Sequence, residues 1–523
     1  MRLVWLLAGG LGLAAAYVDQ MLRWLRVLQR EHYEAAAPAR FWRRWTFPSL
    51  RYARVATLRR YRPISLGYVL CCALPVVVIV AVFASLAAPL VVVTIAYGLC
   101  CPWGLGPRGR TSALQWTRRL RTVAVAALAI SAAVSLAAVV AGAGLVVGAL
   151  MVWAVPFTLG LAAAALEPYE NRLAGRFVDQ ARQRLARVHP LVVAITGSYG
   201  KTSTKNHLAD LLRGDGGVVA TPKSFNNRAG LSRSINENLA DGTRVFIAEM
   251  GTYGPGEIAA LCAWCPPEIA VITAIGPVHL ERMGSLDVIE RAKFEITEQA
   301  RVVIVNADDP RLATWPSRLG ERRVRTAGSA NPTADVRVTP TEGLWRVWVD
   351  GLKVAEVPAV AGLQPTNVAC ALAAALELGA TTGELARRLG ALAPVANRAT
   401  VATAPSGVVL IDDTFNANPA SARASLDLLD SLGVAGRRVV VTPGLIELGD
   451  EQAAANEELG REVARRGAQL VVVGRTNAAA LMVGYGPEAQ HLRLRDEAVA
   501  WVRSSLVAGD AVLYLNDLPD HYP

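Results

Sequence analysis

The pattern of hydrophobic and polar positions divides the chain into two contrasting parts. Residues 64–107 and 122–166 contain no Asp, Glu, Lys or Arg, and each stretch is long enough for two membrane-spanning helices of roughly 20 residues. Reversal points at 85–89 and 141–144 predict that each stretch forms a helical hairpin. The apolar segment 4–18 predicts a fifth span, with a cleaved secretory signal as the alternative.

After residue 190 the pattern becomes that of an α/β protein. Short apolar runs typical of buried strands alternate with segments of helical period, which indicates a parallel sheet with crossover helices. The first series occupies residues 191–196, 245–250, 269–275 and 302–307, and a second series at 407–413, 437–444, 468–474 and 510–517 predicts another sheet. Residues 334–357 alternate between apolar and polar positions as antiparallel hairpins do.

Composition supports this division of the chain. A mean hydropathy of +0.31 and 53% hydrophobic residues are too apolar for an ordinary soluble enzyme of 523 residues. We therefore expect an α-helical membrane domain (1–166), a linker helix (167–190), a central α/β domain with a parallel sheet (191–398) and a Rossmann-like C-terminal domain (399–523).

The distribution of charge predicts an orientation in the membrane. Residues 19–63 contain eleven Arg and three acids, and residues 108–121 contain five Arg and no acid. Because such basic loops stay on the cytoplasmic side, we expect a multi-pass protein of the inner membrane with its N-terminus outside and its catalytic half in the cytoplasm. Trp24, Trp42, Trp45 and Tyr52 lie among the arginines of the first loop, and we expect this loop to contact anionic head groups.

The same distribution argues against nucleic acid as a partner. Residues 1–190 carry 22 basic and 6 acidic residues, whereas the whole chain has a net charge of +11, so the remainder is net negative by about five charges. The basic balance therefore belongs to the predicted membrane domain, and the lipid bilayer is the partner that it indicates.

A glycine-rich turn joins the first predicted strand to a helix. Its residues are Gly197, Ser198, Tyr199, Gly200, Lys201 and Thr202. Backbone amides and the helix N-terminus would face a phosphate, with Lys201 as a point charge and the Thr202 hydroxyl as a Mg²⁺ ligand. An ATPase half that drives a transporter is one alternative, but the predicted spans contain no charged residue to mark a polar pathway.

The motifs that follow, in their order, resemble the Mur ligase family from about residue 190 to the C-terminus. They are "ITGSYGKTSTK" (195–205), "SFNNRAG" (224–230), "AEMGTYGPGEIAAL" (248–261), "ITAIGPVHLERMGSLDVIERAKFEI" (272–296), "NADDP" (306–310), Arg398, "IDDTFNANP" (411–419) and "GLIELGDE" (444–451). The resemblance implies an ATP-dependent ligase that activates a carboxylate as an acyl phosphate, which an amine then attacks to form an amide.

The resemblance also implies two Mg²⁺ sites. Thr202 and Glu249 would hold one ion at the β- and γ-phosphates, and His279 with a carbamylated Lys293 would hold the second. Without the family, Glu249 would be interpreted as a turn cap, His279 as a packed histidine and Lys293 as a solvated charge on an exposed helix.

Further residues are implied to bind the nucleotide and the substrate. Asn367 would contact the adenine, Asp413 the ribose and Arg398 the phosphates. Asn226 and Asn227 are both candidates for orienting the substrate or the γ-phosphate, and the sequence leaves this choice open.

Two departures from the family pattern bear on the substrate. The family's "GxHNxxN" element is reduced here to "GLQPTNVA" (362–369), and Asn456 stands where a His is common. Predicted spans also replace the family's sugar-nucleotide-binding domain, which favours a carboxylate carried by a membrane lipid or an envelope polymer and joined to an amino acid or peptide amine. The alternatives are the addition of D-alanyl-D-alanine to UDP-N-acetylmuramoyl-tripeptide and a poly-γ-glutamate-type synthesis.

Overall fold

The computed structural model describes residues 2–46, 87–107, 113–214, 216–360, 362–393, 399–414, 417–518 and 521–522. These residues form two compact units. Unit 1 comprises Met1–Arg172, Gly474–Ala479 and Leu518–Pro523, and unit 2 comprises Leu173–Val473 and Ala480–Asp517.

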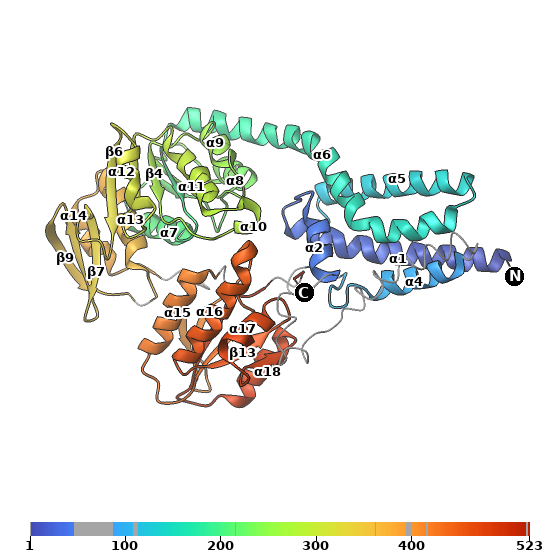
Figure 1. Ribbon diagram of the computed structural model, residues 1–523. Helices are drawn as coiled ribbons and strands as arrows, with labels where there is room; N and C mark the ends of the chain where they lie inside the picture. The colour runs from blue at the N-terminus through green and yellow to red at the C-terminus, as the bar shows by residue number, and fades with distance from the viewer. Residues whose placement is uncertain are drawn as a thin grey trace. The chain divides into compact units, whose positions relative to one another are not determined.

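Unit 1 is built from helices (Figure 1). They are α1 (Arg2–Arg30), α2 (Ala37–Thr46), α4 (Ala87–Cys100), α5 (Arg118–Val140) and α6 (Gly144–Val188), of which α6 continues into unit 2. The rings of Tyr97 and Trp153 stack with centroids 3.6 Å apart, and Trp153 Nε1 donates to Thr94 Oγ1 at 3.1 Å. Aromatic stacking therefore joins α4 to α6.

The hairpin predicted for 122–166 is confirmed as two helices, because α5 ends at Val140 and α6 begins at Gly144. Among the described residues, these two helices are long and apolar enough to cross a membrane. Residues 64–86 of the first predicted hairpin lie outside the described residues, and the described α4 has 14 residues, fewer than a span requires. The prediction of five spans thus goes beyond what the described chain supports.

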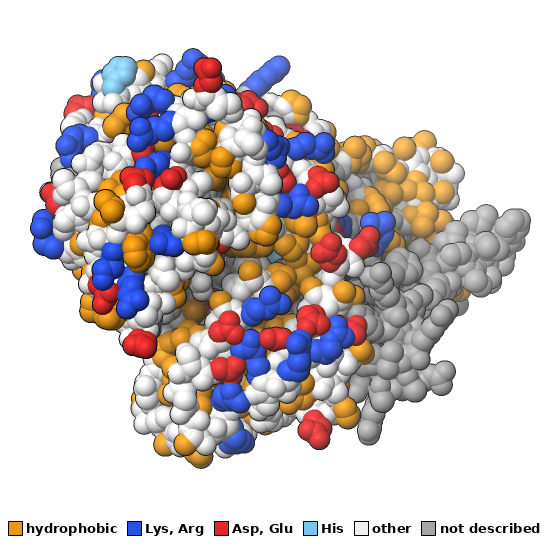
Figure 2. Space-filling view, turned by 60° about the vertical axis from the view of Figure 1, so that its left-hand side comes forward, with side chains coloured by type: hydrophobic (Ala, Val, Ile, Leu, Met, Phe, Trp, Pro, Cys, Tyr) orange, Lys and Arg blue, Asp and Glu red, His pale blue; other side chains and the backbone are white. Residues whose placement is uncertain are grey.

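Apolar side chains cover the outside of α5. Val125, Leu128, Leu136, Val139 and Val140 are all more than half exposed. Figure 2 shows hydrophobic side chains gathered at the upper right of the view, whereas acidic and basic side chains are interspersed over the rest of the described face in view. Such continuous apolar exposure is expected of helices that contact lipid or another apolar surface.

The expectation that Trp24 and Trp45 contact head groups is wrong. Trp24 is fully buried and Trp45 is 6% exposed. Arg23 of the same segment is also buried, and its guanidinium donates to the carbonyl oxygens of Leu99 and Leu105. Carbonyls in the last turn of α4 and in the segment that follows it therefore satisfy the buried arginine. Tyr52 lies outside the described residues.

Unit 2 contains a nine-stranded sheet with the order β2-β3-β1-β4-β5-β6-β7-β8-β9. The strands are β1 (Leu191–Thr196), β2 (Val218–Ala220), β3 (Val245–Glu249), β4 (Ile269–Ile272), β5 (Val302–Asn306), β6 (Arg323–Gly328), β7 (Val336–Thr341), β8 (Leu344–Val349) and β9 (Leu352–Pro358). Pairing is parallel from β2 to β7 and antiparallel from β7 to β9. The predicted parallel sheet and the predicted hairpins are both confirmed.

Helices cover both faces of this sheet (Figure 1). They are α7 (Lys201–Leu211), α8 (Arg228–Asn238), α9 (Glu257–Cys262), α10 (Leu280–Met283), α11 (Leu286–Phe294), α12 (Trp315–Arg318), α13 (Pro365–Glu377) and α14 (Thr382–Leu389). Alternate residues of β1 point to opposite faces, so that Val192 and Ala194 enter one core and Val193 and Ile195 the other. The first core also contains residues of α8, α9 and α11 together with the C-terminal part of α6, and the second contains residues of α7, α13 and α14.

The second sheet has six strands in the order β10-β11-β15-β12-β13-β14. They are β10 (Thr400–Thr403), β11 (Val409–Asp413), β12 (Arg438–Thr442), β13 (Gln469–Val473), β14 (Gln490–Leu492) and β15 (Ala511–Leu515), with helices α15 (Pro419–Ser431), α16 (Gln452–Arg465), α17 (Ala478–Tyr485) and α18 (Arg495–Ser505). Only β10 pairs antiparallel among these described strands. The second predicted sheet is confirmed.

Helix α7 buries a histidine. His207 is 1% exposed, and neither ring nitrogen makes a hydrogen bond with any residue that the structure describes. Burial lowers the pKa of His207 to about 4, because the charged imidazolium would lose its hydration there. The neutral ring therefore acts as a core side chain.

We predict that His207 makes the fold sensitive to acid. Its folded pKa is depressed, so the unfolded chain binds more protons between about pH 6.5 and pH 4, and stability falls as the pH falls through this window by up to about 3 kcal/mol. His207→Leu should abolish this contribution. The measurement is the melting temperature of the purified full-length protein at pH 7.5 and pH 5.0; an equal loss of melting temperature in wild type and variant would contradict the prediction.

Candidate active site

The phosphate-loop turn lies between the end of β1 at Thr196 and the start of α7 at Lys201. Gly197 has φ +152° and Gly200 has φ +82°, backbone angles that other residues rarely adopt. A Cβ at Gly197 would lie 2.0 Å from Thr273 Oγ1, and one at Gly200 would lie 2.3 Å from Asn367 Oδ1. Both glycines are therefore required, and the loop is held tightly between the end of β4 and the start of α13.

Hydrogen bonds fix the loop from both sides. The Ser198 amide donates to the Ala274 carbonyl at 2.8 Å, and Ser198 Oγ donates to the Gly276 carbonyl at 2.9 Å. Lys201 Nζ donates to the Gly197 carbonyl at 2.7 Å and so lies over the turn. The ammonium group, the amides at the start of α7 and the helix dipole are the kinds of group that bind an anion.

Tyr199 fills the space above a neighbouring glycine. A Cβ at Gly276 would lie 1.4 Å from the Tyr199 hydroxyl. Burial, with the charge of Asp309 as a lesser cause, raises the pKa of Tyr199 to about 12, so the phenol stays protonated. The tyrosine therefore packs the loop against the 274–276 segment.

Glu249, the last residue of β3, lies in a buried ion pair that the sequence did not indicate. Glu249 and Lys205 are each 1% exposed, and Lys205 Nζ lies 3.3 Å from Glu249 Oε2. Asn226 Nδ2 donates to Glu249 Oε1 at 3.1 Å, and Lys205 Nζ also donates to the Lys223 carbonyl. The only sequence signal was the position of Lys205 four residues after Lys201, one helical turn along α7.

The residues at this point fit a Mg²⁺ ion. Glu249 Oε2 is buried and accepts no hydrogen bond from the described residues, and the Lys205 ammonium group lies 3.3 Å from it, so a bound cation would share this carboxylate with Lys205. Thr202 lies in the first turn of α7 and is 8% exposed. A carboxylate and a hydroxyl oxygen are hard ligands of the kind that Mg²⁺ prefers.

Lys293 is buried rather than solvated. It lies on α11, whose first turn Ser285 caps by accepting a hydrogen bond from the Val288 amide, and it is 4% exposed. Burial and, second, the charge of Lys201 hold the pKa of Lys293 well below its ordinary value. The interpretation of Lys293 as a surface charge is therefore wrong, and burial favours the neutral form of its amine.

His279 stands at the start of α10 with φ +57°. Its Nδ1 contacts the carboxylate of Glu447, and its ring meets that of Tyr253 edge-on with centroids 4.5 Å apart. The sequence gave no sign of this Glu447 contact, because the two residues are 168 positions apart. Asn456 holds the segment that carries Glu447, since it accepts from the Leu445 amide at 2.8 Å and donates to the Leu445 carbonyl at 2.9 Å.

The structure separates the two candidate asparagines. Asn226 points to Glu249, as described above, and its own carbonyl accepts a hydrogen bond from the Gly251 amide at 2.7 Å. Asn227 is the N-cap of α8, and its side chain accepts from the Gly230 amide at 2.9 Å. Asn226 therefore belongs to the site, whereas Asn227 has a structural task.

Of the predicted nucleotide contacts, Asn367 lies at the phosphate loop, where its side chain faces Gly200. Asp413 ends β11, is 5% exposed and accepts from Ser425 Oγ at 2.8 Å. Arg398 lies outside the described residues. The structure therefore brings Asn367 to the loop and gives Asp413 a buried partner in its own domain.

The two aspartates of the "NADDP" motif accept hydrogen bonds from segments that flank the phosphate loop. The Asp308 carboxylate accepts from the Asn331 amide at 2.8 Å and from Thr366 Oγ1 at 2.7 Å, and Asp309 Oδ2 accepts from the Ile275 amide at 2.7 Å. The motif thus holds the segment after β4 and the start of α13, which flank the phosphate loop.

Comparison with known proteins gives two domain matches and close relatives. The Mur ligase middle domain matches residues 195–375, and the Mur ligase glutamate ligase domain matches residues 397–515. The UDP-N-acetylmuramoyl-tripeptide–D-alanyl-D-alanine ligase of Mycobacterium leprae is 33% identical, over 62% of this chain and 70% of that protein. The protein of the same name from Mycobacterium tuberculosis is 34% identical, over 62% of this chain and 69% of that protein.

A solved structure agrees with the sequence matches. The MurF ligase of Thermotoga maritima in complex with ADP superposes with a TM-score of 0.57 and 27% identity, over 66% of this chain and 80% of that structure. The two matched domains and the relatives indicate the same family. The chain therefore belongs to the Mur ligase family of ATP-dependent ligases that form amide bonds.

Proposed function

We propose that this protein is a membrane-anchored ligase that joins an envelope-precursor carboxylate to the amine of an amino acid or dipeptide. The observation that carries the proposal is the buried Glu249 carboxylate, whose Oε1 accepts a hydrogen bond from Asn226 and whose Oε2 lies 3.3 Å from Lys205 of the helix that follows the phosphate loop. The names of the relatives supply the chemistry: a muramoyl-tripeptide carboxylate and D-alanyl-D-alanine.

In the first step the substrate carboxylate oxygen attacks the γ-phosphorus of ATP, the bond to the β-bridging oxygen breaks, and ADP leaves. The loop amides and Lys201 would hold and neutralise the phosphates during this transfer. Thr202 and Glu249 would hold Mg²⁺, which supplies further positive charge at the β- and γ-phosphates when bound. Asn367 and Asp413 would contact the adenine and ribose, and Arg398 the phosphates.

In the second step the amine attacks the acyl carbon, and the tetrahedral intermediate expels phosphate while the nitrogen loses a proton. Asn226 would orient the reacting groups, since its amide already lies on Glu249. The net change is one amide bond formed and one ATP converted to ADP and phosphate.

Lys293 would take part as a carbamate. The lone pair of its uncharged amine attacks CO₂, a nitrogen–carbon bond forms, a proton leaves the nitrogen, and an anionic oxygen ligand results. The low pKa that burial imposes supplies the required neutral amine. With His279, this carbamate would hold a second Mg²⁺, whereas an ammonium group there would repel it.

Membrane anchoring is the part of the proposal that concerns how the substrate is presented to this ligase. The apolar helices α5 and α6 support anchoring by length and composition, with the catalytic half in the cytoplasm where ATP is available. A carboxylate presented at the bilayer suits such a protein, and the alternatives are soluble UDP-muramoyl-tripeptide and a poly-γ-glutamate-type chain. Membership of an amide-ligase family favours ligation over an ATPase-driven transporter.

We predict that Lys293→Arg loses nearly all ligation, because arginine stays positively charged and forms no carbamate. Lys293→Ala should also be inactive, yet partly recover when a small carboxylate such as formate occupies the vacated oxygen position. Phosphate release with UDP-muramoyl-tripeptide and D-alanyl-D-alanine as the first candidate pair, at saturating ATP and Mg²⁺, is the readout. Wild-type turnover by Lys293→Arg would refute the carbamate.

The two neighbouring asparagines provide a matched pair. Asn226→Ala should lower the rate of ligation at least tenfold, because Glu249 loses the donor that orients its carboxylate. Asn227→Ala should leave the rate within a factor of two but cost about 1 kcal/mol of stability, the usual cost of removing an N-cap. Turnover and melting temperature of both variants test this, and the reverse pattern would assign the orienting role to Asn227.

A truncated chain tests the role of the membrane part. It should begin at Leu173, because Val178, Ala181 and Leu185 of α6 belong to the core of unit 2. We expect residues 173–523 to retain ATP binding but to lose ligation of a carboxylate presented on lipid vesicles. If the truncated and full-length proteins use only a soluble carboxylate, and use it equally well, the membrane-presented substrate is excluded.

A further inference from the structure

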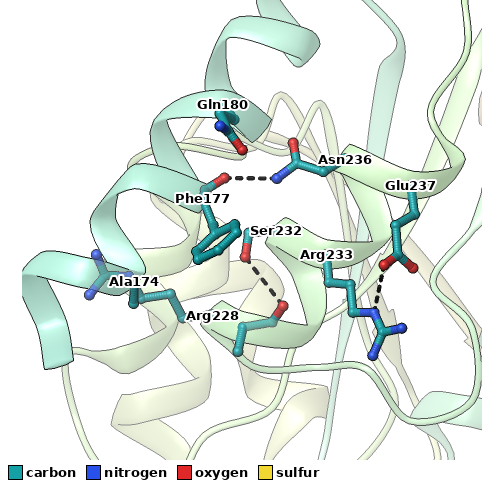
Figure 3. A pocket seen from close by; sticks show the side chains of 9 residues that line it. Ala174, Phe177, Gln180, Arg228, Ser232, Arg233, Asn236 and Glu237 are labelled. Atoms are coloured by element: carbon teal, nitrogen blue, oxygen red, sulfur yellow. Dashed lines mark hydrogen bonds and ion pairs between the residues drawn. The ribbon is translucent and has the colours of Figure 1, made fainter. Parts of the chain in front are cut away.

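A pocket of about 390 Å³ lies between the C-terminal part of α6 and helix α8, apart from the phosphate-loop residues (Figure 3). Ala174, Phe177 and Gln180 line it from α6, and residues from Arg228 to Glu237 line it from α8. None of these residues has a part in the ligation chemistry proposed above.

The floor of the pocket is apolar. The Phe177 ring projects from α6 toward Ser232 of α8 and is 60% exposed (Figure 3). Ser232 Oγ donates to the Ala229 carbonyl of its own helix at 3.2 Å, and Asn236 Nδ2 donates to the Phe177 carbonyl at 3.0 Å. Because the polar groups near the ring are already hydrogen-bonded, an apolar ligand group would gain by covering it.

Basic side chains stand at the rim. Arg233 Nε donates to Glu237 Oε1 at 2.8 Å, so this pair is neutralised. Arg228 makes no ion pair or hydrogen bond with the residues that the structure describes, and a Cβ at Gly175 would lie 3.8 Å from its Nη2. The Arg228 guanidinium therefore reaches across to α6 beside the apolar floor, with its charge uncompensated.

We propose that this pocket binds the phosphate head group of an amphiphile, with Arg228 on the phosphate and Phe177 against the first part of the apolar tail. A guanidinium fork matches two phosphate oxygens, and the adjacent phenyl ring distinguishes an amphiphile from a free anion. The apolar run of α6 ends at residue 166, only eight residues before Ala174 in the same helix. The pocket residues of α6 therefore follow, in the same helix, shortly after an apolar segment that could contact lipid.

The site goes beyond the proposed function, since it recognises a head group and would bind it even if the ligated carboxylate were soluble. It also bears on that function, because Arg228 follows Asn226 by two residues. A head group held by Arg228 would lie next to the residues that carry Asn226, whose side chain donates to Glu249.

The test uses the full-length protein in nanodiscs of phosphatidylcholine, titrated with phosphatidic acid that carries a fluorescent group on its tail. Saturable binding is expected. Arg228→Gln should weaken it at least tenfold and Phe177→Ser at least fivefold, whereas Arg228→Lys should retain most of the affinity. The matched control is Arg182→Gln, because Arg182 is an exposed arginine of α6 outside the pocket; it should change nothing.

A second variant keeps the test independent of the stability of Arg228→Gln. Among the described residues, a Cβ at Gly175 would have Arg228 Nη2 as its only neighbour within 4 Å, at 3.8 Å. Gly175→Glu should therefore place a carboxylate beside the Arg228 guanidinium, compete with the ligand and weaken binding as Arg228→Gln does. An equal loss in Arg182→Gln would show a general charge effect and overturn the proposal. Equal binding of labelled phosphatidylcholine would also overturn the proposal. So would displacement of the labelled lipid by millimolar inorganic phosphate, if this displacement is the same in Phe177→Ser as in the wild type.

Discussion

The ion pair between Lys205 and Glu249 is the interaction on which the geometry of the site depends. Both side chains are almost fully buried, and the pair joins helix α7, which begins at the phosphate loop, to strand β3. Removing one partner of such a pair typically costs about 3–5 kcal/mol, because the remaining charge stays buried without compensation. Lys205 also holds the Lys223 carbonyl and Glu249 holds Asn226, so the same pair fixes the 223–226 loop. The buried Lys205 thereby sets the relation between the turn before α7, the Glu249 carboxylate and Asn226.

Features that depend on local sequence could be predicted, and features that depend on distant contacts could not. The glycines of the phosphate loop and the alternation of residues 334–357 encode their own conformations, and the structure agrees with both. The contact between His279 and Glu447 could not be foreseen, because no local pattern links positions so far apart. The burial of Lys293 was hidden for a different reason: "LDVIERAKFEI" has the polar residues of an exposed helix, and only tertiary packing shows which face is covered.

The C-terminal part of helix α6 contributes to the α/β unit that follows it. Helix α6 runs without interruption from its apolar part to Val188. Val178, Ala181 and Leu185 of this helix lie in a core of unit 2. Amphipathic residues after an apolar run resemble a linker in sequence, yet they supply part of the hydrophobic surface that the first sheet must cover. The α/β fold therefore includes a piece of the helix that leads into it, and the pocket beside Phe177 exists because that piece packs against α8.

The close packing of Tyr199 on Gly276 has a consequence for how this family can diverge. The phenol occupies the space that any side chain at position 276 would need, so the two positions form a single steric unit although 77 positions separate them. We expect alanine at 276 to be accepted only after, or together with, a smaller residue at 199, because in the opposite order the new Cβ would clash with the Tyr199 phenol. The history of substitution at these two sites should therefore be correlated and ordered in time, with changes at the loop tyrosine preceding changes at the glycine.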